Sequence, residues 1–108
     1  MPRTLEPLMD IVLGCQKISN DCLDACLKED DTSKMAECIR RNRECADMCG
    51  IVLDFAQRGS EILPDLLEVC AKSCDLNADE CEKHAHDHCQ SSAKASRACA
   101  KVCRNYIS

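Results

Sequence analysis

The twelve cysteines of this 108-residue chain are its most reactive residues, and they recur in pairs with one spacing. The pattern C-x3-C occurs at positions 22/26, 45/49, 70/74 and 99/103. On a helix, residues four apart lie on one face with Cβ atoms roughly 6 Å apart, so both sulfurs of a pair can hold one ion between them. The spacing therefore predicts metal binding by pairs of thiolates.

The C-x3-C spacing favours Cu(I) as the metal. Structural zinc sites and iron–sulfur clusters typically present C-x2-C pairs, which this sequence lacks. Two thiolates on opposite sides of one ion suit a soft monovalent metal. Zn²⁺ needs four ligands in a closed tetrahedron, and we expect a continuous column of cysteines not to divide into such sets. One Cu(I) per thiolate also keeps a buried interior near neutral, whereas zinc would bury net charge.

The stretch CEKHAHDHC, residues 81–89, holds all three histidines of the chain between two cysteines. We expect it at the entrance of a thiol-lined interior, where imidazoles can receive or relay ions. His84 continues the helical spacing of Cys81, and His88 lies beside a cysteine. For His86, a solvated turn is an equally good interpretation.

The elements that must position these cysteines are four helices, separated at breaker residues. We predict an all-α, antiparallel up-down-up-down four-helix bundle with a cysteine-lined core, forming one domain over residues 1–108. The first helix is expected over about 3–28, followed by a polar turn in which Thr32 or Ser33 caps the second helix. Gly59 ends the second helix, and the histidine-rich stretch joins the third to the fourth.

Each predicted helix carries one stripe of inward positions in steps of three and four, as in the seam of a bundle. Every cysteine falls on a stripe, so the interior should be lined by sulfur. The stripes are Leu8, Val12, Cys15, Ser19, Cys22, Cys26; Met35, Cys38, Asn42, Cys45, Cys49, Val52, Ala56; Leu63, Leu67, Cys70, Cys74, Asn77, Cys81; and Ala85, Cys89, Ser92, Ser96, Cys99, Cys103, Tyr106.

The antiparallel order predicts two unlike ends for the bundle. One end brings together a cysteine from each of the four helices beside the histidines: Cys26, Cys38, Cys81 and Cys89. The thioether of Met35 lies at the same end, as a ligand or as packing. The other end gathers apolar side chains into a plug: Leu5, Leu8, Ile51, Val52, Phe55, Ile62, Leu63, Leu66, Leu67 and Ile107.

Composition narrows the partners and the compartment. The net charge of −5 argues against nucleic acid and anionic membranes as partners. No stretch is apolar and long enough to span a bilayer. The first residues do not read as a signal peptide, and few turn residues oppose a disulfide scaffold. We therefore expect reduced thiols in the cytoplasm.

Other functions remain open at this point. A single cysteine on a bundle seam usually serves only as a small buried side chain. Twelve of them would leave voids in the core, beside polar seam residues that need hydrogen-bond partners, so we expect a bound ligand to complete the core. A zinc or general soft-metal buffer and a thiol redox protein are the competing interpretations. No cysteine is singled out by a paired base, so we do not expect an enzyme.

The chain resembles the cysteine-rich four-helix-bundle copper storage proteins, particularly their cytosolic branch. The resemblance covers nearly the whole chain and rests on C-x6-C-x3-CL at 15–27, ECIRRNRECADMC at 37–49, CAKSC at 70–74, CEKHAHDHC at 81–89 and CAKVC at 99–103. It implies storage of multiple Cu(I) ions by core thiolates, with histidines at the open end, in a homo-oligomer such as a tetramer.

The sequence departs from this family at positions where members often carry further cysteines. Ser92 and Ser96 stand at such positions in the last helix, and Ser19 and Asn77 are similar gaps. A thinner array of thiols is expected to hold fewer ions and to divide into separate clusters. The expected metal ligands are the twelve cysteines with the three histidines and one methionine: Cys15, Cys22, Cys26, Cys38, Cys45, Cys49, Cys70, Cys74, Cys81, Cys89, Cys99, Cys103, His84, His86, His88 and Met35.

Overall fold

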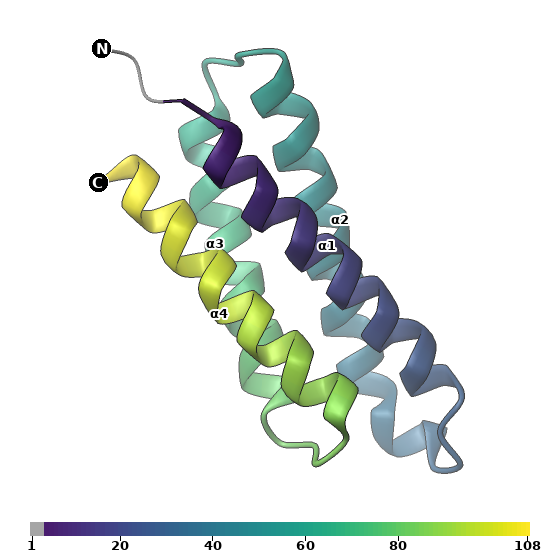
Figure 1. The fold of residues 1–108 in the computed structure, drawn as a ribbon. Helices are drawn as coiled ribbons and strands as arrows, with labels where there is room; N and C mark the ends of the chain where they lie inside the picture. Colours follow the sequence, from purple (N-terminus) through teal and green to yellow (C-terminus); the bar gives the residue numbers. More distant parts are fainter. Residues whose placement is uncertain (1–3) are drawn as a thin grey trace.

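Four antiparallel α-helices form the fold of residues 4–108, the part of the chain that this computed structural model describes (Figure 1). They are α1 (Glu6–Leu27), α2 (Ala36–Gln57), α3 (Leu63–Cys81) and α4 (Asp87–Ile107), with a short 3-10 helix, η1 (Thr32–Met35), before α2. Each α-helix packs mainly against two neighbours, so that α1 contacts α2 and α4, and α3 contacts the same two. The predicted up-down-up-down bundle is confirmed, and it measures 51 × 20 × 18 Å.

The turn between α2 and α3 follows from one glycine. Gly59 adopts φ +64°, a left-handed conformation that side chains other than glycine rarely tolerate. The N–H of Ser60 donates to the carbonyl of Phe55, and the N–H of Gly59 donates to the carbonyl of Ala56, both at 3.1 Å. This pair of hydrogen bonds is a Schellman motif, which satisfies the last carbonyls of α2 and stops the helix where the sequence predicts.

The start of α2 differs from the prediction. Neither Thr32 nor Ser33 caps this helix, because η1 intervenes and Met35 occupies the N-cap position without a side-chain hydrogen bond. Thr32 instead donates its hydroxyl hydrogen to the carbonyl of Glu29 at 2.6 Å, closing the preceding turn. The first helix begins at Glu6, and its predicted start at residue 3 lies outside the described residues.

The predicted stripes are buried almost throughout. Every residue of the first three stripes is buried, and so are the stripe cysteines and stripe serines of α4. Ala85 is the exception and the prediction was wrong there: it is exposed in the turn between α3 and α4, because α3 ends at Cys81. Tyr106, at the far end of α4, is half-buried.

An apolar plug closes the end of the bundle at which α2 joins α3, as predicted. Its buried members are Leu8, Val12, Val52, Ala56, Leu63 and Leu67, with Leu5, Phe55, Leu66 and Ile107 packed against them. Ile51 and Ile62 were wrongly assigned to the plug, because their side chains are 39% and 48% exposed. The described N-terminal residues and the C-terminus lie at this end, and the α1–α2 and α3–α4 turns lie at the other (Figure 1). No helix among residues 4–108 has the length and apolar character needed to cross a membrane.

Candidate metal centre

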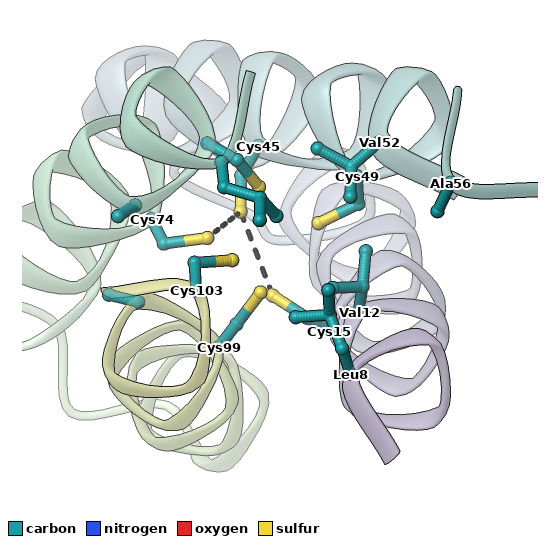
Figure 2. Packing of buried hydrophobic residues seen from close by; sticks show 14 of the residues in the cluster. Leu8, Val12, Cys15, Cys45, Cys49, Val52, Ala56, Cys74, Cys99 and Cys103 are labelled. Carbon is teal, nitrogen blue, oxygen red and sulfur yellow. Dashed lines mark hydrogen bonds between the residues drawn. The ribbon is translucent and has the colours of Figure 1, made fainter. Parts of the chain in front are cut away.

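All twelve cysteines are buried and carry free thiols. They come from all four helices, and their sulfurs point into the space between the helices; Figure 2 shows this for Cys15, Cys45, Cys74 and Cys99. The interior is therefore a column of sulfur, and its contacts divide the twelve residues into two sets.

Five cysteines lie at the end with the histidines and are called the mouth set here: Cys22, Cys26, Cys38, Cys81 and Cys89. Their sulfurs are close across helices. The Sγ atom of Cys38 lies 3.8 Å from that of Cys26, 3.6 Å from that of Cys81 and 3.8 Å from that of Cys89. The Cys22 and Cys26 sulfurs, an i,i+4 pair on α1, are 3.9 Å apart. Thiols from all four helices are thus available to metal ions at this end.

Seven cysteines lie between the middle of the bundle and the apolar plug and are called the deep set: Cys15, Cys45, Cys49, Cys70, Cys74, Cys99 and Cys103. The Sγ atom of Cys45 lies 3.7 Å from that of Cys15 and 3.5 Å from that of Cys74 (Figure 2). Cys70, Cys99 and Cys103 form one close group, with sulfurs within 4.8 Å of one another. Leu8, Val12 and Val52 pack against this set from the plug side.

The sulfurs also form two groups of four, which corrects an expectation. The Sγ atoms within 4.8 Å of one another belong to Cys15, Cys49, Cys74 and Cys99 in one group, and to Cys22, Cys26, Cys38 and Cys89 in the other. We expected the column not to divide into sets of four. That expectation was wrong because cysteines from four helices meet in the first group and from three helices in the second, whereas the spacing along one helix shows only pairs. Four thiolates at this separation can also surround Zn²⁺.

His88 is the histidine that faces the sulfurs. Its Nδ1 atom lies 3.3 Å from the sulfur of Cys22, 3.6 Å from that of Cys89 and 4.0 Å from that of Cys26. Its Nε2 atom lies 2.9 Å from a carboxylate oxygen of Glu29. With Nε2–H donating to the carboxylate, the lone pair of Nδ1 points at the sulfurs, as required of a metal ligand.

Glu29 is a functional candidate that the sequence did not reveal. It lies in the turn after α1 and was interpreted only as a polar turn residue. Besides holding His88, its carboxylate lies 3.6 Å from Nδ1 of His86, whose ring stacks on that of His88 with centroids 5.2 Å apart. Glu29, His86 and His88 together bring ligand atoms within 4.8 Å of one another. No spacing rule connects a turn carboxylate to histidines 57 and 59 residues later, so only the fold brings them together.

His84 and Met35 are placed differently from His88. Because α3 ends at Cys81, His84 does not continue the helix; its Nε2 atom lies 2.8 Å from the carboxylate of Glu80. Met35 is buried and packs in the cluster that contains the mouth set. A surface pocket of about 340 Å³ lies between α1 and α4 at this end of the column. It is lined by Ile18, Asp21, Cys22, His88 and Ser91, and Cys22 itself is 1% exposed.

A layer of polar side chains crosses the column between the two sets, and it is called the Asn–Ser layer here: Ser19, Asn42, Asn77, Ser92 and Ser96, all fully buried. Ser92 donates to Oδ1 of Asn42 at 2.6 Å, while Nδ2 of Asn77 donates to the hydroxyls of Ser92 at 3.1 Å and Ser96 at 3.0 Å. Among the described residues, every buried side-chain nitrogen and oxygen has a hydrogen-bond partner. Mutual hydrogen bonding is what makes so much buried polarity tolerable.

The thiols of each set do not ionise equally. In the mouth set, hydrogen bonds from the thiols of Cys22 and Cys38 lower the pKa of Cys81 to about 3. Hydrogen bonds with Cys22 and Cys81, together with burial, raise the pKa of Cys38, so this thiol keeps its proton. Burial raises the pKa of Cys89 to about 11. The thiolate is the form that binds metal, and the lowered pKa of Cys81 favours that form.

The raised pKa values predict that the metal-free protein loses stability in alkali. Cys89 ionises near its ordinary pKa of 9.0 when the chain unfolds but only at about pH 11 when folded, so from pH 9 to 11 unfolding releases its proton. Stability is therefore fully present below pH 9 and is lost as pH rises, by roughly 1 kcal/mol per pH unit for this thiol. Denaturant unfolding under anaerobic, reducing conditions measures this; the Cys89→Ser variant should show a shallower decline, and identical pH profiles would contradict the assignment.

A family model and curated and solved relatives match this chain over nearly its full length. The family model described as copper storage protein matches residues 1–108. The cysteine-rich protein YhjQ of Bacillus subtilis (strain 168) is 37% identical over 105 residues, which is 97% of this chain and 97% of that protein.

Two solved structures extend the similarity to three dimensions. The Cu(I)-bound copper storage protein BsCsp3 superposes with a TM-score of 0.93 at 36% identity, over 96% of this chain and 98% of that one. A cytosolic copper storage protein from Streptomyces lividans, solved with five coppers, superposes with a TM-score of 0.89 at 30% identity, over 93% of this chain and 88% of that one. In both comparisons most of each chain is covered, so the similarity extends over the whole four-helix bundle.

Proposed function

The chain belongs to the copper storage protein family, and from this membership we propose that it binds and stores several Cu(I) ions through the cysteine thiolates that line its core. The observation that carries the proposal is the burial of all twelve cysteines as free thiols facing one interior. One relative with the same fold is Cu(I)-bound, and another was solved with five coppers. Soft thiolates select Cu(I) among the metals available to a cell.

Charge neutrality supports a filling near one Cu(I) per thiol. Each thiolate that binds gives up its proton and carries one negative charge, which one monovalent ion cancels. A buried array of twelve thiolates without that compensation would be very costly in the low dielectric of a protein interior. The expected capacity therefore approaches twelve ions per chain, the number of cysteines.

We assign the ligand roles as follows. The twelve cysteines bind the stored ions, and His88 hands ions between solvent and the mouth set because its Nδ1 atom lies 3.3 Å from the sulfur of Cys22. Glu29 orients this imidazole by accepting a hydrogen bond from its other nitrogen. His86, stacked on His88, and Met35, packed beside the mouth set, are further candidate ligands. His84 needs to leave Glu80 before it can take part.

The wider role follows the same reasoning. Residues 1–108 would act as one non-enzymatic storage domain in the cytoplasm, with copper ions as partner and with no nucleic acid or membrane involved. Support comes from a relative that is described as cytosolic, from the acidic charge of −5 and from the position of His88, which faces three cysteine sulfurs together rather than serving as the base of one. Exposed apolar side chains on the outer faces of the helices, such as Val69 and Leu76, suit assembly into a homo-oligomer such as a tetramer.

A zinc buffer is the second candidate, and the two groups of four sulfurs favour it. A group such as Cys22, Cys26, Cys38 and Cys89 can surround one Zn²⁺. Each such site would bury a net charge of about −2, which the monovalent metal avoids.

Anaerobic titration of the reduced protein decides between these functions. With Cu(I) supplied against a chromophoric chelator, storage predicts uptake approaching twelve ions per chain. A zinc buffer would take about three Zn²⁺, one per four thiols, and would release none of them to Cu(I). Uptake of fewer than two Cu(I) per chain would contradict storage, and a count of free thiols in protein purified without reductant tests the redox alternative.

A further inference from the structure

The two sets of cysteines are separate compartments in their contacts. Within residues 4–108, no sulfur–sulfur hydrogen bond joins the mouth set to the deep set, and each close group of sulfurs draws its members from one set only. The two buried hydrophobic clusters of the bundle divide at the same level. A Cu(I) ion passing by exchange from thiolate to thiolate therefore meets a break halfway along the column.

The Asn–Ser layer fills this break and presents a different surface to each side. Toward the mouth, the Nδ2 atom of Asn42 lies 3.3 Å from the sulfur of Cys38 and 3.4 Å from those of Cys22 and Cys81. Toward the deep set, the hydroxyl of Ser96 lies 3.9 Å from the sulfur of Cys15 and 3.8 Å from that of Cys45. Amide and hydroxyl oxygens are hard ligands that Cu(I) does not favour.

The mouth set and the deep set also differ in how close they lie to solvent. The surface pocket lined by Cys22 and His88 leads to the mouth set, whose cysteines are themselves at most 1% exposed. The deep set has the apolar plug on its other side, where Leu8, Val12 and Val52 are at most 3% exposed. The route to the deep set that the structure offers therefore runs through the mouth set and across the Asn–Ser layer.

We propose that the Asn–Ser layer divides the store into a rapidly exchanging mouth compartment and a retained deep compartment, with the layer as the barrier between them. This inference rests on the proposed function of Cu(I) storage. Passage of an ion requires the hydrogen bonds among Asn42, Asn77 and Ser92 to open in a buried site. Three hydrogen bonds join these residues, and each bond left unmade slows passage roughly tenfold, so deep ions should leave on the order of 1,000-fold more slowly than mouth ions.

Removal of Cu(I) from the loaded protein by excess bathocuproine disulfonate tests this proposal. Each Cu(I) passes to the chelator, and the released thiolate takes a proton from water. We expect two phases, with about five of every twelve ions in the fast phase, matching five mouth and seven deep cysteines. Cys22→Ser with Cys26→Ser should reduce the fast amplitude, and Cys70→Ser with Cys103→Ser should reduce the slow one.

A thiol bridge across the layer provides the decisive variant. Ser92→Cys with Ser96→Cys supplies soft ligands between the compartments, and we expect the slow phase to accelerate at least tenfold toward a single phase. The matched control is Ala98→Cys, which adds a thiol at an exposed position of the same helix and should leave the slow rate unchanged. Far-ultraviolet circular dichroism of both variants checks that the bundle is intact.

The outcomes separate the two proposals. A protein that takes up no Cu(I) contradicts storage itself. A protein that fills with Cu(I) but releases it in one phase, at a rate that the bridge variant does not alter, contradicts only the division into compartments. Two phases whose amplitudes follow neither pair of cysteine variants also overturn the division.

Discussion

Loading the reduced protein with Cu(I) is expected to raise the midpoint of thermal unfolding by tens of degrees. Ligands that bind the folded state stabilise it by about 4 kcal/mol each when their free concentration is 1,000-fold above the dissociation constant. For a domain of this size, each kcal/mol shifts the midpoint by roughly 4 to 8 °C. Several ions therefore have a very large combined effect, even after some binding to cysteines of the unfolded chain is subtracted.

This stabilisation is expected to be large because the core of the metal-free protein lacks large apolar side chains. Sulfurs, hydroxyls and amides replace the large apolar side chains of an ordinary bundle, and the chain has one Phe, one Tyr and no Trp. Metal–sulfur bonds between helices supply the cohesion that packing does not. Thermal scans by circular dichroism, with and without Cu(I) and then after its removal by a chelator, measure the shift. A midpoint that is unchanged by filling would show that the ions bind outside the core.

The second large effect is expected from Cys22→Ser with Cys26→Ser, which removes one C-x3-C pair from the mouth set. The variant should lose about two Cu(I) per chain, one for each thiol removed, and it should load more slowly because His88 loses its nearest sulfur partner, 3.3 Å away. Because serine is close in size to cysteine, the helices should remain formed. Anaerobic titration against a chelator gives the capacity, and stopped-flow mixing gives the loading rate.

A double variant on the outer face of the same helix is the matched control. Leu13 and Lys17 have the same i,i+4 spacing on α1, and both are exposed. Leu13→Ser with Lys17→Ser should leave the capacity and the loading rate unchanged. Loss of helical structure in the cysteine variant, without loss of capacity, would mean that these two thiols only pack.

The helices and their inward faces could be predicted because they depend on local spacing. Steps of three and four along the chain place Cys15, Cys22 and Cys26 on one face, and the turn at Gly59 has its own chemistry. The boundaries at the other turns were less predictable, since no residue there signals the 3-10 helix before α2 or the early end of α3. Ala85 and His84 were misplaced for that reason.

The burial of the cysteines was predicted from the sequence, but their arrangement in space was not. Sequence identified all twelve cysteines as core residues, since each lies on a stripe. It could not show that four sulfurs from different helices meet at one level, because that depends on the relative register of the helices. The contact between Glu29 and His88 joins two turns and has no local signature either.

The close approach of sulfurs from different helices has a further consequence under oxidation. Cys45 and Cys74 have sulfurs 3.5 Å apart, and Cys38 and Cys81 have sulfurs 3.6 Å apart, whereas a disulfide bond needs about 2.05 Å. Small movements would let an oxidant convert such pairs into disulfide bonds, and the pairs could then no longer bind metal. Bound Cu(I), by occupying those sulfurs, would protect the protein that stores it from disulfide formation.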